Sequence, residues 1–209
     1  MTKLKSKVIS AGIWYTVGNM LIKGINFLSL PLFSRLLNTE EFGIYNVFVS
    51  YEAILYVIIG MAIHSSIRSA NIKFKGNINE YTSSVSIIYL VNAMIMLFIA
   101  LIFNKQLSKL LAFDKLIIVL LIFYSLGSAL LSLYNNYISL EYSYKKYLLV
   151  SFFNSVGNVC ISLVLILTIF KKKRDIGIPV AIFIIEIILS IFLYSHAEAM
   201  IMPLEISAK

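Results

Sequence analysis

Long apolar segments alternate with short polar ones along the whole chain. A helix that crosses a membrane needs about 20 mostly apolar residues, and about six segments come close to that length. They cover approximately residues 8–37, 42–64, 83–103, 116–138, 147–170 and 176–194. Because backbone polar groups must be satisfied within each segment inside a bilayer, every segment is predicted to be a helix. The sequence therefore predicts an all-α, polytopic membrane helical bundle with about six transmembrane helices.

The short polar turn between the first two segments carries the signals of a helix start. Asn38 can cap a helix because its side-chain oxygen accepts a hydrogen bond from a free backbone N–H group. Glu40 and Glu41 then fall in the first turn, where carboxylates suit the positive end of the helix dipole. Asn38 and Glu41 also have the spacing of a capping box. We therefore predict a tight hairpin between two membrane helices.

The composition agrees with a membrane protein and excludes an ordinary soluble domain. Of the 209 residues, 60% are hydrophobic and 13% are charged, and the mean hydropathy is +0.90. Soluble domains average about 45–50% apolar and about 25% charged residues. The formal net charge of +8 comes from basic residues that flank the apolar segments instead of forming one patch. We therefore expect the lipid bilayer, and no nucleic acid, to be the partner of these charges.

The sequence contains no recognisable arrangement of catalytic or metal-ligating residues. Cys160 stands alone inside an apolar segment, and His64 and His196 are far apart. This spacing is not typical of a zinc site, and no glycine loop for phosphate is visible. We expect no enzyme activity, no catalytic residue, no metal site and no cofactor. A membrane-embedded enzyme remains the third alternative to the hypotheses given below.

Polar residues inside the apolar segments are candidates for a functional site. Asn19, Lys23 and Asn26 share one face of the first segment if it is helical. Lys23 lies near the middle of the segment, where a charge facing lipid costs from about 3 to more than about 10 kcal/mol. We therefore predict that this face points into the bundle. Glu52 or Glu186 can neutralise Lys23, so Lys23 is interpreted either as a ligand-binding group or as half of a structural ion pair.

Two stripes of Ser and Asn follow the fourth and fifth segments. They comprise Ser125, Ser128, Ser132, Asn135 and Ser139 in the fourth, and Ser151, Asn154 or Ser155, Asn158 and Ser162 in the fifth. Small polar residues hold membrane helices together without any role in transport. Helix packing and the lining of a cavity therefore both remain open for these stripes.

The amino-acid sequence of the first hairpin, and of the segment after it, resembles that of a known family. Similar residues are Arg35-Leu36-Leu37, Glu41-Phe42-Gly43, Tyr45, Gly60-Met61-Ala62, Ser65-Ser66 and Arg68, and more loosely Tyr144-Lys145-Lys146-Tyr147. The family that they resemble is the polysaccharide-biosynthesis flippases. These flippases belong to the multidrug/oligosaccharidyl-lipid/polysaccharide exporter superfamily.

The resemblance implies one half of a two-bundle transporter that works by alternating access. Residues 1–194 would form the amino-terminal six-helix bundle, and residues 195–209 a short tail that is truncated or disordered. Full-length members have about twice as many spans, and repeat-built transporters place their site between the two halves. We therefore expect a truncated chain that needs a second bundle or a second copy to complete the transport pathway.

The implied function is translocation of undecaprenyl-pyrophosphate-linked oligosaccharide repeat units across the bacterial cell membrane, for capsule or lipopolysaccharide synthesis. The candidate substrate-binding residues are Lys23, Asn19, Asn26, Arg68 and Glu52, and the lipid-linked oligosaccharide is the expected partner. A multidrug or small-cation exporter of the same superfamily is the alternative, as is a fragment that does not transport. Basic residues are nearly balanced between the two ends of the spans. The resemblance favours a cytoplasmic amino terminus, and six spans then place both termini in the cytoplasm.

Overall fold

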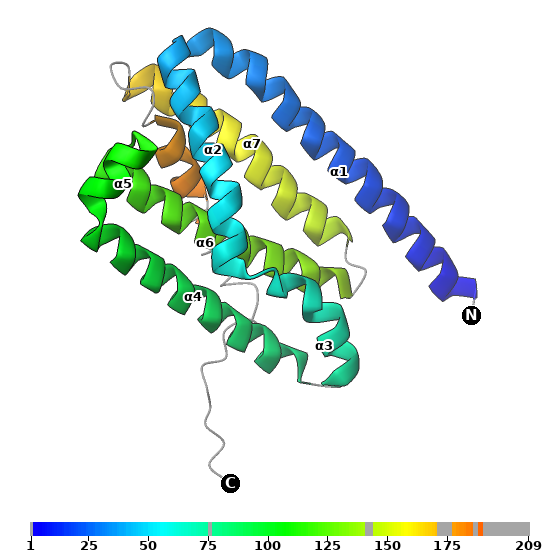
Figure 1. Cartoon of the computed structure of the whole chain (residues 1–209). Coiled ribbons are helices and arrows are strands. Elements are labelled where there is room, and N and C mark those ends of the chain that lie inside the picture. The colour runs from blue at the N-terminus through cyan, green and yellow to red at the C-terminus, as the bar shows by residue number, and fades with distance from the viewer. Residues whose placement is uncertain (1, 75–76, 141–143, 171–176, 186–187, 190–209) are drawn as a thin grey trace.

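The computed structural model describes residues 2–74, 77–140, 144–170, 177–185 and 188–189. In these ranges the chain is helical and has no strand, which confirms the all-α prediction (Figure 1). The elements are α1 (Thr2–Leu36), α2 (Thr39–Gly60), the 3-10 helix η1 (Ile63–Ser66), α3 (Ile67–Lys73), α4 (Ile78–Ile102), α5 (Asn104–Leu111), α6 (Lys115–Leu140) and α7 (Tyr144–Thr168). Residues 177–185 form a further helical stretch.

Within the part of the chain that the structure describes, four helices are long and apolar enough to cross a membrane, namely α2, α4, α6 and α7. The first expected span corresponds to α1, whose 35 residues extend over about 52 Å at 1.5 Å per residue. Its length suffices to cross a bilayer, but it is not among the four. The sixth expected span is described only in part, and the expected tail, residues 195–209, lies outside the described residues. The helical membrane bundle is thus confirmed, with four of its predicted spans.

The predicted capping box closes the hairpin between α1 and α2. The Glu41 backbone N–H donates to Asn38 Oδ1 at 2.8 Å, and the Asn38 backbone N–H donates to Glu41 Oε2 at 2.9 Å. Next to the turn, the rings of Phe33 and Tyr45 lie 5.7 Å apart. From this hairpin the two helices diverge, and Figure 1 shows them separating along their length. The capping box is therefore formed as predicted, whereas the two helices do not remain a tight pair.

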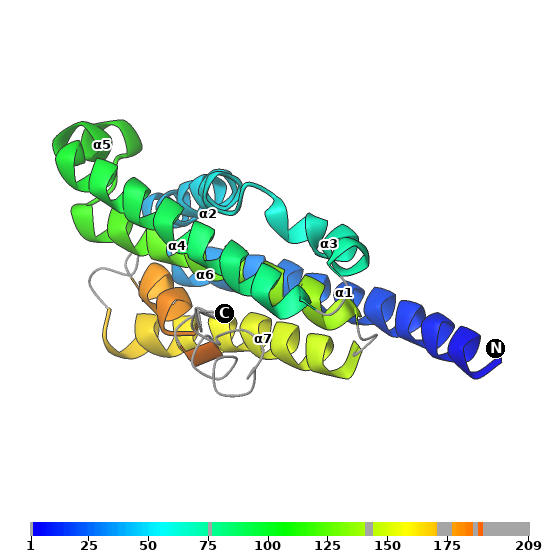
Figure 2. The ribbon, with the colours of Figure 1, turned by 90° about the horizontal axis from the view of Figure 1, so that it is seen from below.

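The helices pack as two groups, and Figure 2 shows α1 beside α7. α2, α3 and α4 pack on α6, whose buried side chains lie on several of its faces. We call these four helices the wall. α1 runs parallel to α7, with Trp14 stacked on Tyr144 and Gly18 against Leu148. We call α1 and α7 the arm.

The connector between α2 and α4 is largely helical, since it contains η1 and α3. Met61 and Ala62 have positive φ angles of 45° and 52°, which end α2 before η1 and α3 begin. A left-handed conformation costs a residue with a Cβ roughly 1–2 kcal/mol. Burial of Ile67 and Ala70 offsets this cost because it attaches α3 to the bundle. The turn therefore lays α3 against α4 and α6.

The chain between α4 and α6 contains the short helix α5. Leu107 and Leu111 pack against the main core, while Lys105 and Lys109 are exposed. A short helix with an apolar face and a basic face is typical of a membrane interface.

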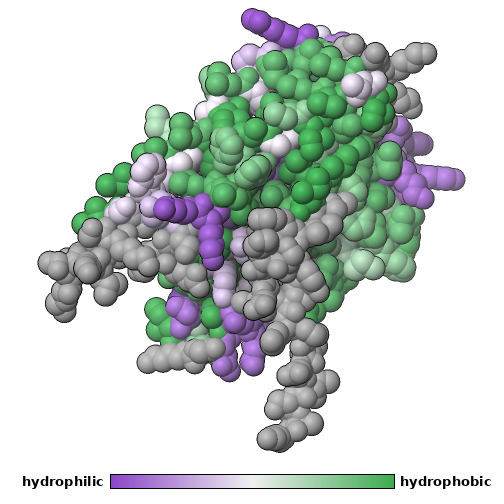
Figure 3. All heavy atoms as spheres, turned by 180° about the vertical axis from the view of Figure 1, so that it is seen from behind, coloured by the Kyte–Doolittle hydropathy of each residue, from purple (hydrophilic) through white to green (hydrophobic). Residues whose placement is uncertain are grey.

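Exposed apolar side chains cover much of the surface, as the face drawn in Figure 3 shows. On α4, for example, Met94 is 62% exposed and Phe98 is 66% exposed. An exposed apolar surface of this extent is unfavourable in water and favourable against lipid tails. The fold is therefore that of a membrane-embedded helical bundle.

Candidate functional site

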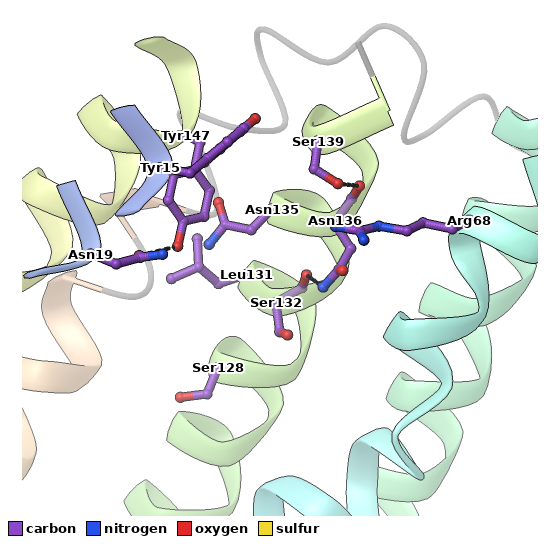
Figure 4. Close-up of a pocket in the computed structure, with 10 residues that line it drawn as sticks. All are labelled: Tyr15, Asn19, Arg68, Ser128, Leu131, Ser132, Asn135, Asn136, Ser139 and Tyr147. Carbon is purple, nitrogen blue, oxygen red and sulfur yellow. Dashed lines mark hydrogen bonds between the residues drawn. The ribbon is translucent and has the colours of Figure 1, made fainter. Parts of the chain in front are cut away.

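A polar pocket of about 500 Å³ lies where the arm meets the wall (Figure 4). Nine of the ten described residues that line it are polar, and Arg68 is the one charged residue among these ten. The lining consists of Tyr15 and Asn19 from α1, Arg68 from α3, Ser128, Leu131, Ser132, Asn135, Asn136 and Ser139 from α6, and Tyr147 from α7. A cluster of amides, hydroxyls and one guanidinium group is costly to keep in a membrane unless it serves a function.

The pocket begins at one end of the bundle and reaches towards its middle. Along α6 it extends from Ser139, next to the helix end, to Ser128. These positions are 11 residues apart in sequence, or about 16 Å at 1.5 Å per residue. The hydrocarbon core of a bilayer is about 30 Å thick. A group that enters the pocket from the membrane surface can therefore reach about half of the way across.

Arg68 is carried to the pocket by α3. Its neighbours on this helix, Ile67 and Ala70, are buried against the bundle, so the helix is fixed while Arg68 stays exposed. Ser66, just before α3, is hydrogen-bonded to the Tyr81 hydroxyl at 2.6 Å. Figure 4 shows the Arg68 side chain extending towards Asn136 on α6. An exposed guanidinium group at the rim of a polar pocket is suited to bind a phosphate in two-point contact.

Behind the pocket, α2 supports two of the serine residues that line it. The Tyr56 hydroxyl donates to Ser132 Oγ at 3.0 Å, and Glu52 interacts with Ser128 one turn away. The ring of His64 in η1 lies 3.4 Å from the Tyr56 hydroxyl. Burial lowers the pKa of His64, so the neutral ring is favoured at that position. These contacts hold the serine side of the pocket in place.

The arm provides the opposite side of the pocket. The Tyr147 hydroxyl donates to Asn19 Oδ1 at 2.6 Å, and the rings of Tyr15 and Tyr147 meet edge to face at 5.0 Å. Gly18 permits this close approach of α1 and α7, because a Cβ atom there would overlap the Leu148 side chain. The tyrosine rings add apolar surface to an otherwise polar lining.

The structure brings together two of the five predicted site residues, Asn19 and Arg68. Glu52 stands behind the lining, in contact with Ser128. Lys23 and Asn26 are exposed and do not line this pocket, so of the three residues of the predicted face only Asn19 points into it. The physical reason is the divergence of α1 from α2. It leaves the face of α1 that carries Lys23 open.

The two polar stripes have different outcomes. Four of the five predicted positions on α6 line the pocket, whereas Ser125 is buried and donates to the Leu121 carbonyl oxygen. The stripe on α7 contributes nothing to the pocket lining, and its Ser155 and Ser162 are buried. The cavity interpretation therefore holds for α6, and the packing interpretation suits α7.

Four residues of the pocket were not among the predicted positions, namely Tyr15, Leu131, Asn136 and Tyr147. Asn136 follows Ser132 by four residues, so the helical repeat could have indicated it. Nothing local marks Tyr15, because its place in the pocket depends on the pairing of α1 with α7. Within the described ranges, no three metal-ligating side chains come together.

The fold and the pocket define a helical membrane protein with a polar site between its helices. The chain matches the polysaccharide biosynthesis protein family over residues 8–197 and belongs to that family. This confirms the resemblance seen in the first hairpin and places the chain in polysaccharide biosynthesis. No curated protein and no solved structure matches the chain.

Proposed function

We propose that the chain is a flippase, or part of one, for undecaprenyl-pyrophosphate-linked oligosaccharide repeat units. The observation that carries this proposal is the polar pocket with Arg68 at one end of a membrane bundle, in a member of a polysaccharide biosynthesis family. The head of such a substrate combines sugar hydroxyls with an anionic pyrophosphate. Amide and hydroxyl side chains suit the first, and a guanidinium group suits the second.

The position of the pocket suits loading from the cytoplasm. The pocket lies at the end where α1 begins and α2 ends, and a cytoplasmic amino terminus puts this end inside the cell. The proposed location is therefore the bacterial plasma membrane, with roles in capsule or lipopolysaccharide synthesis, and a second bundle or second copy completing the pathway.

A small-cation exporter is the weaker alternative. Its cavity would favour acidic groups, because a cation is stabilised by carboxylates. Among the described lining residues the one charge is the guanidinium group of Arg68, which would repel a cation. The pocket thus favours an anionic substrate.

The test is surface polysaccharide export in the source bacterium after deletion of the gene and complementation with variants. Arg68→Ala removes charge-assisted hydrogen bonds worth about 1.5–3 kcal/mol, so we expect apparent substrate affinity to fall about 10- to 150-fold. Arg68→Lys keeps the charge without the two-point geometry and is expected to retain part of the export.

The matched control is Lys73→Ala, because Lys73 is also exposed on α3 but does not line the pocket. We expect it to export normally at normal abundance. Equal export by Arg68→Ala and Lys73→Ala would contradict the role of Arg68. Normal surface polysaccharide after deletion would favour a fragment that does not transport.

A further inference from the structure

The arm and the wall are joined differently at the two ends of the bundle. At the hairpin end, Phe33 of α1, Leu37 just after α1 and Ile166 of α7 belong to the main hydrophobic core. At the pocket end, α6 and α7 meet through a small separate cluster of buried residues, Tyr134, Ile138 and Val150. The arm is therefore anchored to the wall at one end and held by a small apolar contact at the other.

Two polar atoms are enclosed without a hydrogen-bond partner among the described residues where the arm meets the wall. They are the hydroxyl of Tyr15 on α1 and Oδ1 of Asn135 on α6. Both residues line the pocket, and Figure 4 shows Asn135 beside the rings of Tyr15 and Tyr147. An unpaired polar atom penalises the state that encloses it. The closed contact between the arm and the wall, which we call the seam, is thus disfavoured relative to a state in which these atoms meet water or a ligand.

We propose that the seam between the arm and the wall opens at the pocket end and that Tyr15 and Asn135 then bind hydroxyl groups of a sugar. A sugar hydroxyl can donate to Asn135 Oδ1 and accept from the Tyr15 hydroxyl. The end that contains Ile166 stays packed and serves as the hinge. This subsite rests on the function proposed above and names the part of the pocket that takes the sugar.

The opening is tested on the purified chain in lipid nanodiscs by the labelling of single cysteines with a water-soluble methanethiosulfonate. The background is Cys160→Ser, because Cys160 is exposed. Val150→Cys reports the pocket end, and Ile166→Cys reports the hinge, since both residues lie on α7 and are only 3% and 1% exposed. We expect Val150→Cys to react at least about tenfold faster, because the reagent needs water to reach the thiol.

The role of the two unpaired atoms is tested by the double substitution Tyr15→Phe with Asn135→Leu. It removes both polar atoms with little change of shape, so it is expected to favour the closed seam and slow the labelling of Val150→Cys about tenfold or more. Surface polysaccharide export is expected to fall while protein abundance stays normal. A merely structural role for these residues predicts the opposite, a looser seam and faster labelling.

Each outcome decides one part of the proposal. Equal labelling at the two reporter positions, fast or slow, overturns the opening. Labelling that the double substitution leaves unchanged or accelerates overturns the role of the unpaired atoms, and slower labelling with normal export overturns the sugar subsite. If the parent chain supports no export, the proposed function fails, while the labelling rates still decide whether the seam opens.

Discussion

The close contact between α1 and α7 makes a quantitative prediction at Gly18. A methyl group at this position would overlap Leu148 Cδ2 and come within 3.0 Å of its Cγ. Overpacking of this kind costs about 1–3 kcal/mol, and the flexible end of Leu148 can relieve part of it. Replacing glycine by alanine inside a helix contributes about 1 kcal/mol in the opposite direction. The net effect of Gly18→Ala is therefore destabilisation by up to about 2 kcal/mol.

Gly24→Ala is the matched control on the same helix. No atom lies within 4 Å of the Cβ that it would add, so it keeps the gain in helix propensity without an overlap. The difference in unfolding free energy between Gly18→Ala and Gly24→Ala should thus equal the cost of overpacking, about 1–3 kcal/mol. Unfolding can be followed through Trp14, the single tryptophan, which stacks on Tyr144 in the same helix pair.

A second substitution separates overlap from other effects of the alanine. Leu148→Ala removes the atoms that a methyl group at Gly18 would meet. In that background Gly18→Ala should cost no more than Gly24→Ala, which gives a coupling energy of about 1–3 kcal/mol in the double-mutant cycle. The reasoning is refuted if Gly18→Ala and Gly24→Ala unfold alike, or if the penalty persists in Leu148→Ala.

Three further predictions concern single positions and the topology. Asn38→Ala breaks the capping box and should lower the unfolding free energy by about 1 kcal/mol, whereas Asn38→Asp should cost little. Both are measured by following unfolding through Trp14. If the exposed Lys23 side chain binds substrate together with a second bundle, Lys23→Ala should lower polysaccharide export while the protein keeps its normal abundance. A fall in the abundance of the protein would instead indicate that Lys23 belongs to a structural ion pair. Cysteines at Lys73 and Lys109 in a Cys160→Ser background should react with an impermeant thiol reagent from the cytoplasmic and the outer side, respectively. Labelling of the Lys73 position from outside intact cells would overturn this orientation.

The sequence by itself determined the class of fold and the local features. Apolar segments of membrane-spanning length require helices, because backbone groups in a bilayer are satisfied only within the segment. The capping box of Asn38 and Glu41 was equally predictable, because it depends on residues three positions apart. The polar positions of α6 were also visible from the helical repeat, although the sequence could not say whether they line a pocket or pack against a neighbour.

The partners of these polar faces were decided by the tertiary structure. Lys23 precedes Asn38 by 15 residues and Glu52 follows it by 14, so a tight hairpin would place them at the same depth. The divergence of α1 from α2 separates them and instead brings Asn19 to Tyr147, 128 residues away in sequence. Local periodicity fixes which side chains share a face of one helix. Which other helix meets that face depends on packing between distant segments, and the pocket between the arm and the wall is a product of that packing.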